Sequence, residues 1–393
     1  MEKVVCLFID ALRPDFVNEK DTPFLYKLFS ENPSMDIKTI LGYSDAIDAT
    51  IFTGAYPDIH GYWMKYQYSP STSPFKSPVF SPFRMIDYIP FPLVRSGVNF
   101  VLYNTFYKWY SRKVGYKDIA AFNIPYSILS YFDFTLRKTL MDEDVFSIPT
   151  IFDVLRENNR SFFYSHGVNS KVLNTLKDKD LGIIYLSDID LSAHLFGIEN
   201  SSFSETLLRI DNMIKDIFKF CKRNIPNVNI LLFSDHGMAK VNNILDFRYL
   251  LKEDGFEDQY LFTLDGTMIR FWYFKERAME KIHDLFEDKT YGHFLTEMEK
   301  RDLRIQFNHN RYGDDIFLLD QGYAIFPNFM SWSKPKAMHA YHPKYEEQRG
   351  VFMLHGKPCI DKKEIELVDI MPTILDIMEL EIPSTVEGES ILR

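Results

Sequence analysis

The amino-acid sequence predicts an α/β fold with a doubly wound, mostly parallel central sheet and two insertions that form a cap. Three short apolar runs, each followed by acidic residues, are the first observation. The runs are continuously apolar rather than alternating, which is typical of parallel strands covered on both faces. Helix-like stretches such as residues 204–222 lie between them. In sheets of this kind, ligands bind beyond the carboxyl ends of the strands.

The predicted strands are residues 4–9, 182–186 and 228–233, and each leads into a carboxylate. Because the carboxyl ends of parallel strands share one edge, we expect Asp10, Asp190 and Asp235 to converge there. Asp10 taken alone has a commoner interpretation, since an acid after a strand often caps a helix.

Histidines lie close in the sequence to two of these acids. His194 follows Asp190 by four residues, so both side chains face one ion if the segment is helical, and His236 comes directly after Asp235. His339 is a further candidate, with a surface or core histidine as its alternative. Together these residues offer two sets of oxygen and imidazole donors, which suit a pair of zinc or similar divalent ions.

Residues 44–53 read as a helix with Ser44 at its N-cap and Gly54 just past its end. One interpretation of Ser44 is a plain capping serine. The functional interpretation is a nucleophile, because the backbone N–H groups and dipole at a helix N-terminus favour an anion such as a phosphoryl group.

The division into domains follows changes in composition. The core is expected to contain residues 1–61, 148–249 and 337–393, and the insertions residues 62–147 and 250–336. Proline and aromatic residues crowd the first insertion, which predicts an irregular cap whose rings pack on each other, with stacking of a nucleobase or lipid tail as the alternative.

The remaining elements are assigned from local pattern. The second insertion mixes a strand-like stretch, residues 267–274, with a charged helical run, residues 277–304. An amphipathic helix over residues 365–380 is expected to be interrupted by Pro372.

Length and composition exclude several classes. The chain has 393 residues, of which 46% are hydrophobic and 25% charged, unlike a disordered chain, a collagen or a coiled coil. Its net charge of -10 opposes binding to a nucleic-acid polymer, because a phosphate backbone selects positive surfaces. A small phosphate ester or nucleotide in a metal-lined pocket is compatible with this charge.

The cysteines and the N-terminus predict the compartment. Cys6, Cys221 and Cys359 are too few for a disulfide framework and are expected to be buried thiols of a reducing compartment. The apolar run that ends at Asp10 is too short for a signal peptide. Without an apolar run of about 18 residues, no membrane span is expected. These features predict a cytoplasmic protein.

The motifs together resemble the nucleotide pyrophosphatase/phosphodiesterase family of the alkaline phosphatase superfamily, and they occur in that family's order. The matching segments are residues 10–15 (family Asp-Gly-x-Arg-x-Asp), 22–25 (Thr-Pro-Asn-Leu), 53–61 (Thr-Gly-x-Tyr-Pro-x-x-His-Gly), 190–194 (Asp-x-x-Gly-His), 234–238 (Ser-Asp-His-Gly-Met) and 339–341 (His-Gly-Tyr).

The resemblance implies a two-metal hydrolase that cleaves a phosphodiester or pyrophosphate bond through a covalent phosphoserine. Zn²⁺ is the expected ion, with Mn²⁺ or Mg²⁺ as alternatives. The implied ligands are Asp190, His194 and His339 for one ion, and Asp10, Asp235 and His236 for the other, which also contacts the nucleophile Ser44.

The sequence departs from the family at two places. Ser44 replaces the usual threonine nucleophile, and residues 62–66 lack the asparagine that holds a phosphate oxygen. Lys65 is a candidate for the missing contact, with a solvated surface lysine as its alternative. These departures keep a phosphomonoesterase or a phosphate-transferring mutase as an alternative function; a catalytically degenerate metal-binding regulatory protein is a remote one.

Other residues have lesser predicted roles. His342 is expected either to orient a ligand or to bind an ion directly. The sulfatase branch is disfavoured, because the residues after Ser44 lack its Cys/Ser-x-Pro-x-Arg pattern. The histidines interpreted as structural are His166, His283, His293, His309 and His355.

Overall fold

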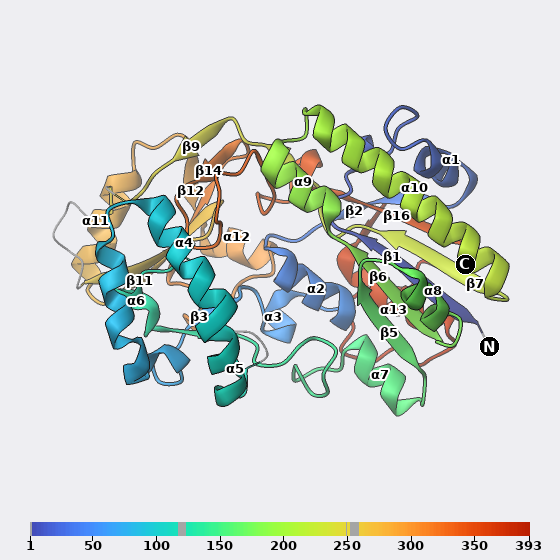
Figure 1. Cartoon of the computed structure of the whole chain (residues 1–393), viewed down its shortest axis with the longest axis horizontal. Coiled ribbons are helices and arrows are strands. Elements are labelled where there is room, and N and C mark those ends of the chain that lie inside the picture. The colour runs from blue at the N-terminus through green and yellow to red at the C-terminus, as the bar shows by residue number, and fades with distance from the viewer. Residues whose placement is uncertain (1, 117–122, 249, 252–258) are drawn as a thin grey trace. The chain divides into compact units, whose positions relative to one another are not determined.

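The computed structural model describes residues 2–116, 123–248, 250–251 and 259–393 (Figure 1). The chain divides into two compact units. Unit 1 comprises Met1–Gly61, Leu140–Lys240 and Lys336–Arg393, and unit 2 comprises Tyr62–Thr139 and Val241–Pro335. Both insertions expected from the sequence lie in unit 2, apart from residues 140–147 and Lys336. Their function as a cap stays a prediction.

Unit 1 is built on a seven-stranded sheet with the order β17-β2-β16-β7-β1-β6-β5. Strand β1 runs parallel to both β6 and β7, β5 runs parallel to β6, and β17 runs parallel to β2. Only β16, among the strands of this sheet, is antiparallel to its neighbours. The predicted, mostly parallel sheet is therefore confirmed. Its strands are β1 (Lys3–Ile9), β2 (Ser34–Lys38), β5 (Phe162–His166), β6 (Leu181–Leu186), β7 (Val228–Phe233), β16 (Gly350–His355) and β17 (Glu364–Glu366).

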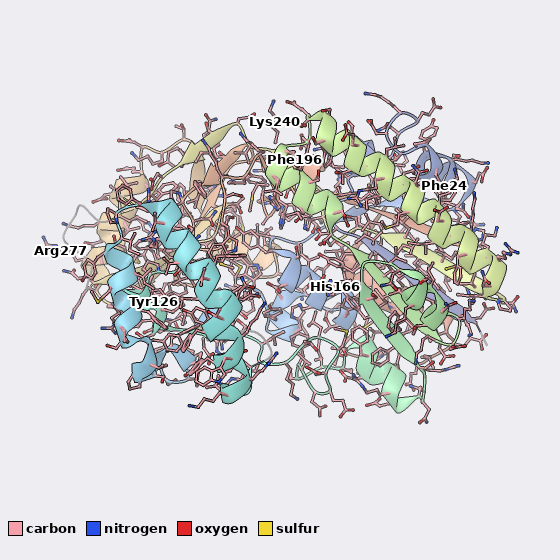
Figure 2. All side chains as sticks on the ribbon, in the orientation of Figure 1. Phe24, Tyr126, His166, Phe196, Lys240 and Arg277 are labelled. Atoms are coloured by element: carbon pink, nitrogen blue, oxygen red, sulfur yellow. The ribbon has the colours of Figure 1, made fainter. Side chains whose placement is uncertain are left out.

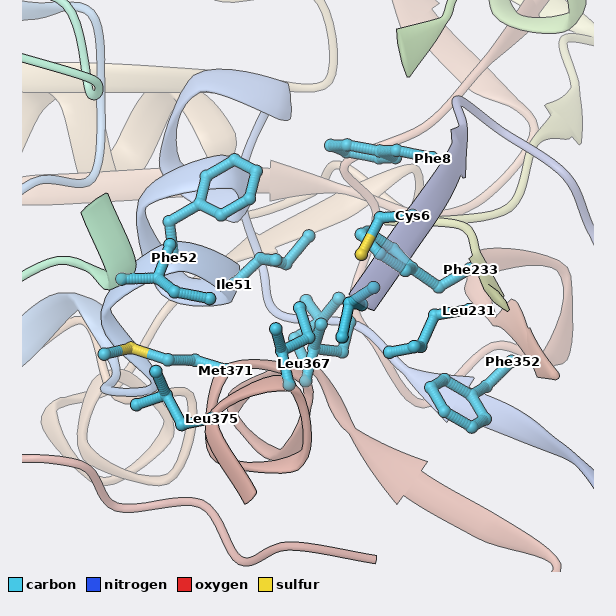
Figure 3. Close-up of a cluster of buried hydrophobic side chains, with 14 of the residues drawn as sticks. Cys6, Phe8, Ile51, Phe52, Leu231, Phe233, Phe352, Leu367, Met371 and Leu375 are labelled. Atoms are coloured by element: carbon cyan, nitrogen blue, oxygen red, sulfur yellow. The ribbon is translucent and has the colours of Figure 1, made fainter. Parts of the chain in front are cut away.

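Helices cover both faces of this sheet, as a doubly wound fold requires. Alternate residues of β1 divide between two hydrophobic cores: Val4, Cys6 and Phe8 pack with α2, α7 and α13, whereas Val5 and Leu7 pack with α1, α8, α9 and α10. Figure 3 shows the first of these cores. The helices are α1 (Pro23–Glu31), α2 (Ser44–Thr53), α3 (Pro57–His60), α7 (Ile151–Glu157), α8 (Ser170–Leu176), α9 (Asp188–Phe196), α10 (Ser201–Asn224) and α13 (Ile370–Ile377).

Short elements complete unit 1. A small antiparallel pair joins the residues that precede and follow the second segment of unit 2, Val241–Pro335. These elements are β8 (Ala239–Lys240), β15 (Ala337–Met338) and the 3-10 helices η1 (Pro14–Phe16), η5 (Glu346–Gln348) and η6 (Leu367–Asp369).

A buried carboxylate joins α1 to α10. The backbone N–H groups of Phe24 and Leu25, in the first turn of α1, donate to Asp211 of α10 at 3.0 and 2.8 Å. These N–H groups have no partner within their own helix, so Asp211 satisfies them from outside. The ring of Phe24 (Figure 2) packs edge-on against Phe218 at 5.8 Å between centroids. The long helix α10 is thereby fixed against α1.

Unit 2 contains a four-stranded antiparallel sheet and two strand pairs. The sheet has the order β10 (Tyr260–Leu264), β11 (Met268–Tyr273), β13 (Asp315–Leu319) and β12 (Gly292–Phe294), and the pairs are β3 (Tyr66–Tyr68) with β4 (Phe132–Phe134) and β9 (Asn243–Leu245) with β14 (Tyr323–Ile325). The helices are α4 (Pro92–Leu102), α5 (Lys108–Val114), α6 (Tyr126–Leu129), α11 (Glu276–Phe286), α12 (Glu297–Asp302), the 3-10 helices η2 (Pro74–Lys76) and η3 (Pro78–Tyr88), and the π-helical η4 (Tyr103–Tyr107).

The aromatic residues of unit 2 form its core. The ring of Phe80 lies within 6.0 Å, between centroids, of the rings of Phe75, Phe83, Phe106 and Tyr110. Such offset and edge-on contacts stabilise beyond the burial of area alone. Packing of the rings on each other is confirmed; a second role in stacking a nucleobase or lipid tail stays a prediction.

Three local predictions were wrong. The first insertion was expected to be irregular, yet α4, η4 and α5 form one helical run that begins at Pro92. Pro92 is the first residue of α4, where proline removes no intrahelical hydrogen bond. The expected run over residues 277–304 is broken by β12, which separates α11 from α12. Pro372 does not interrupt a helix, because α13 begins at Ile370 and its first turn tolerates proline.

The other sequence expectations for the fold concern the thiols and membrane spans. Cys6, Cys221 and Cys359 are buried free thiols, as expected. Within the described part of the chain, the helices are too short or too polar to cross a bilayer.

His60 gives the fold a testable response to acid. Its ring is buried, Nε2 lies 3.1 Å from Thr50 Oγ1, and burial lowers its pKa to about 3. Between pH 6.5 and 3 the unfolded chain binds a proton at His60 that the folded chain does not bind, so stability falls as the pH falls. We expect the free energy of unfolding of the wild type to drop by about 2 kcal/mol more than that of His60→Gln between pH 7 and 5.

Urea unfolding of both proteins at the two pH values measures this difference, since the contributions of all other groups are shared. If the free energy of unfolding falls equally in the two proteins, protonation of His60 does not contribute to the loss of stability in acid.

Candidate active site

Asp10 and Asp235 lie at the carboxyl ends of adjacent parallel strands, β1 and β7, as the sequence predicts. The backbone N–H of Ala11 donates to Asp235 Oδ1 at 3.3 Å, and that of Leu12 donates to Ser234 Oγ at 2.9 Å. The alternative role of Asp10 as a helix cap is excluded, because the next helix, η1, has Arg13 at its N-cap. The two carboxylates therefore face one space beyond the sheet edge.

A backbone carbonyl of the next residue orients the ring of His236. Its Nδ1–H donates to the carbonyl of Gly237 at 2.8 Å, which directs Nε2 to the carboxylates, 3.4 Å from Asp10 Oδ1 and 3.3 Å from Asp235 Oδ2. Glycine is required at position 237, because a Cβ there would lie 2.2 Å from the carbonyl oxygen of Glu347. The Asp-His-Gly sequence thus combines two donors with a close backbone approach.

Asp190 and His194 lie one turn apart on α9, so the helical spacing expected from the sequence is confirmed. His194 Nε2 is 3.1 Å from Asp190 Oδ1, while its Nδ1–H donates to the carbonyl of Ala337 at 2.8 Å. His339 comes from the segment after β15, and its Nε2 is 3.9 Å from Asp190 Oδ1. The rings of His339 and His236 stack at 3.8 Å between centroids, which brings the two groups of donors into one cluster.

Ser44 is the first residue of α2, and Tyr43 is its N-cap. The predicted N-cap position of Ser44 is therefore wrong by one residue, because the extended backbone that marks a cap belongs to Tyr43. Gly54 ends the helix as predicted, in a left-handed conformation with φ 62°. Ser44 Oγ lies 3.5 Å from His236 Nε2, so the hydroxyl faces the cluster of acids and imidazoles.

The donors fit divalent cations. Four buried atoms among the described residues make no hydrogen bond although they belong to this cluster: Asp10 Oδ1, Asp190 Oδ1, Asp235 Oδ2 and His339 Nδ1. Ligand atoms of Asp190, His236 and His339, and likewise those of Asp10, Asp235 and His236, lie within 4.8 Å of one another. His236 belongs to both groups. His194 lies next to the first group, because its Nε2 is 3.1 Å from Asp190 Oδ1.

The electrostatics of the cluster also favour cations. Burial, followed by repulsion from Asp235 and Asp190, raises the pKa of Asp10 well above its ordinary value. Burial likewise raises the pKa of Asp235 to about 7. Burial acts in the same direction on Asp190, but the imidazoles of His194 and His339 outweigh it and hold its pKa below the ordinary value. Positive charge between these carboxylates would remove the cost of ionising them.

Two residues near the cluster were not identified from the sequence. The Tyr185 hydroxyl on β6 donates to Asp10 Oδ2. Asp48 follows Ser44 by one turn of α2, and burial, followed by repulsion from Asp235, raises its pKa well above the ordinary value. Asp48 could have been identified, because a spacing of four residues places it one helical turn from Ser44. The sequence contains no signal that Tyr185 contacts Asp10.

Lys65 and His342 keep their predicted roles as hypotheses. Lys65 belongs to unit 2. His342 Nδ1 accepts from the backbone N–H of Lys344 at 3.0 Å. Of the histidines interpreted as structural, His283 pairs with Asp315 at 2.7 Å.

The sequence of the chain is similar to those of known proteins. A family model described as type I phosphodiesterase / nucleotide pyrophosphatase matches residues 4–342. The alkaline phosphatase PhoV of Synechococcus elongatus is 24% identical over 266 residues, which cover 58% of this chain. The match spans 47% of that relative, about half its length.

Solved structures resemble the whole chain. Murine ectonucleotide pyrophosphatase / phosphodiesterase 5 has a TM-score of 0.68 at 16% identity, covering 97% of this chain and 96% of that one. An inactive variant of the murine protein in complex with AMP gives the same TM-score and identity over 98% and 96% of the two chains. The human protein gives a TM-score of 0.68 at 13% identity over 98% and 97%. These similarities show a shared fold.

The hydrogen bond from Tyr185 predicts a role in metal affinity. It occupies Asp10 Oδ2 and leaves Oδ1 directed at the cluster. Because outer partners orient the ligands of a metal, we expect Tyr185→Phe to weaken Zn²⁺ binding by about tenfold or more. Calorimetric titration of Zn²⁺ into the metal-free protein measures the affinity.

Tyr116→Phe is the matched control, because it also removes a buried tyrosine hydroxyl that donates to an aspartate, Asp133 Oδ1 at 2.8 Å, which is not part of the cluster. Unchanged affinity in Tyr185→Phe, or an equal loss in both variants, would contradict a specific role for Tyr185.

Proposed function

The chain belongs to the type I phosphodiesterase / nucleotide pyrophosphatase family, a family of phosphoester hydrolases, and we propose that it cleaves a phosphodiester or pyrophosphate bond with Ser44 as nucleophile. One observation carries the proposal: Ser44 Oγ lies 3.5 Å from His236 Nε2, in a cluster where one buried oxygen of each acid lacks a hydrogen bond. These oxygens are Asp10 Oδ1, Asp190 Oδ1 and Asp235 Oδ2. The proposed substrate is a small phosphate ester or a nucleotide. An AMP complex of a protein with the same fold supports a nucleotide.

We propose that Asp190, His194 and His339 hold one divalent cation, and that Asp10, Asp235 and His236 hold a second beside Ser44. The oxygen and imidazole donors suit Zn²⁺, with Mn²⁺ or Mg²⁺ as alternatives. When bound, the two cations would lower the pKa of the Ser44 hydroxyl and neutralise negative charge on the phosphoryl group.

The reaction proceeds in two displacements at phosphorus. Ser44 Oγ loses its proton to solvent and forms a bond to phosphorus while the bond to the leaving oxygen breaks and that oxygen takes up a proton. This step releases an alcohol or phosphate product and leaves a phosphoserine that still carries the substrate's other substituent. Water then attacks phosphorus and loses a proton, the bond to Oγ breaks and Oγ takes up a proton, which releases the phosphate monoester and regenerates the serine. Ser44 begins α2, so the N-terminal end of that helix adds favourable polarity for the phosphoryl oxygens.

Hydrolysis of a phosphomonoester is the second candidate function. The named relative is an alkaline phosphatase, and residues 62–66 lack the asparagine typical of the family. Lys65 is the residue we propose to supply a compensating contact, and a cytoplasmic location stays a prediction.

Ser44→Ala should abolish turnover, because the variant lacks the hydroxyl that attacks phosphorus. We expect kcat to fall by about three orders of magnitude or more, with two metal ions per chain retained as measured by elemental analysis. Ser44→Thr, which restores the family's nucleophile, should recover activity. A Ser44→Ala protein that keeps wild-type kcat would refute the nucleophile, whatever its metal content.

The metals and the substrate class are tested together. Chelation should remove activity against bis(p-nitrophenyl) phosphate, and added Zn²⁺ or Mn²⁺ should restore it. We expect a higher kcat/KM for this diester than for p-nitrophenyl phosphate. The reverse ratio would favour the phosphomonoesterase, and full activity after complete removal of metal would overturn the two-metal site.

A further inference from the structure

Unit 2 presents an exposed surface, here called the basic-aromatic segment, formed by residues 84–113. Between Met85 and Trp109, seven large hydrophobic side chains are exposed, and Tyr88, at 86%, is more exposed than any other large hydrophobic side chain of the described residues. The seven are Met85, Tyr88, Phe91, Val94, Phe100, Val101 and Trp109. Clusters of this kind on a folded surface indicate an interaction site.

The segment is firmly held from inside, so its exposed rings do not reflect loose packing. Figure 1 shows α4 running through η4 into α5 along one side of unit 2. The inward side chains Tyr107 and Tyr110 belong to the aromatic core. The Tyr107 hydroxyl donates to that of Tyr126 (Figure 2) at 2.8 Å. The helical run thus has a buried face and a separate exposed apolar face.

The charge of the segment is opposite to that of the chain. It contains five basic residues and a single acid, Asp87, in a protein of net charge -10. Asp87 is already used inside unit 2, where it accepts from the backbone N–H groups of Tyr126 and Ser127. The basic residues are Arg84, Arg95, Lys108, Arg112 and Lys113.

Basic and aromatic groups adjoin each other along α5. The ammonium group of Lys113 lies 5.4 Å from the ring of Trp109, and that of Lys108 lies 5.4 Å from the ring of Tyr103. Lys108, Arg112 and Lys113 are exposed, as is Trp109. Apolar side chains next to lysine and arginine are typical of helices that lie in the interface of a membrane.

We propose that the basic-aromatic segment docks the protein on an anionic lipid surface. Its positive charge is complementary to anionic headgroups, and Phe100, Val101 and Trp109 supply apolar groups for insertion below them. A second copy of the chain is a poorer partner, because a two-fold interface would place the five basic residues against themselves. A nucleic acid offers no partner for exposed aliphatic groups such as Val94 and Met85. The proposal requires neither Ser44 nor the metal site.

Co-sedimentation of the full chain with vesicles tests this proposal. In 0.1 M NaCl, we expect the protein to bind vesicles of 70% phosphatidylcholine and 30% phosphatidylserine at least about threefold more strongly than vesicles of phosphatidylcholine alone. In 0.5 M NaCl the preference should fall, because salt screens exposed charges.

Two double variants address the charge and the apolar groups separately. Arg112→Glu with Lys113→Glu, and Phe100→Ser with Trp109→Ser, should each reduce binding by about tenfold or more. All four side chains are exposed, so both variants are expected to keep the circular dichroism spectrum and melting temperature of the wild type. Matched controls lie on the exposed face of α10: Lys219→Glu with Arg223→Glu, and Leu208→Ser, should bind as the wild type.

Three results would overturn the proposal. These are a wild type that does not bind the anionic vesicles, a wild type that binds neutral and anionic vesicles equally, and segment variants that bind like the controls. Light scattering tests the rival explanation, in which a second copy of the chain covers this surface. If the wild type is a dimer and the segment variants are monomers, the surface is a contact between copies.

Discussion

The cost of ionising carboxylates that are buried close together is the constraint on which the site of unit 1 depends. The sheet topology brings Asp10 and Asp235 to one edge, and α9 adds Asp190, so three acids share a space with little access to water. Ionising Asp10 and Asp235 there is costly, as their raised pKa values show. Positive charge between the carboxylates would remove this cost. Hydrogen bonds from the surrounding residues hold the candidate metal-ligand atoms in place.

The way each donor is held explains why the surrounding sequence is restricted. His194 and His236 each use Nδ1–H to bond a backbone carbonyl, which leaves Nε2 for the cluster. Gly237 lets the loop at Glu347 approach the segment that carries His236. Tyr185 occupies one oxygen of Asp10 and leaves the other directed inward. These groups fix the geometry before any ion binds, which reduces the cost of ordering the site.

Much of this arrangement was predictable because it depends on short segments. Continuous apolar runs identify buried strands, and the residues after them must lie at the sheet edge, so Asp10, Asp235 and His236 could be placed from the sequence. The spacing of Asp190 and His194 likewise requires only one helical turn. The contact of Tyr185 with Asp10 depends instead on which strands are neighbours, a property that no local pattern encodes. The helix start at Ser44 and the place of Pro372 depend on backbone angles at single residues, where assignment from sequence is least certain.

The order of events at the site follows from charge. A phosphate ester is an anion, and ionised carboxylates in the cluster that Ser44 Oγ faces would repel it. The N-terminal end of α2 provides only partial positive charge, about half an elementary charge, which cannot compensate three acids. If the donors hold cations, as we propose, those cations would compensate the carboxylates before a substrate approaches Ser44. The acids that repel a phosphate ester would then be the same groups that bind the cations attracting it, and a protein of net charge -10 would bind a small anion through this local positive charge.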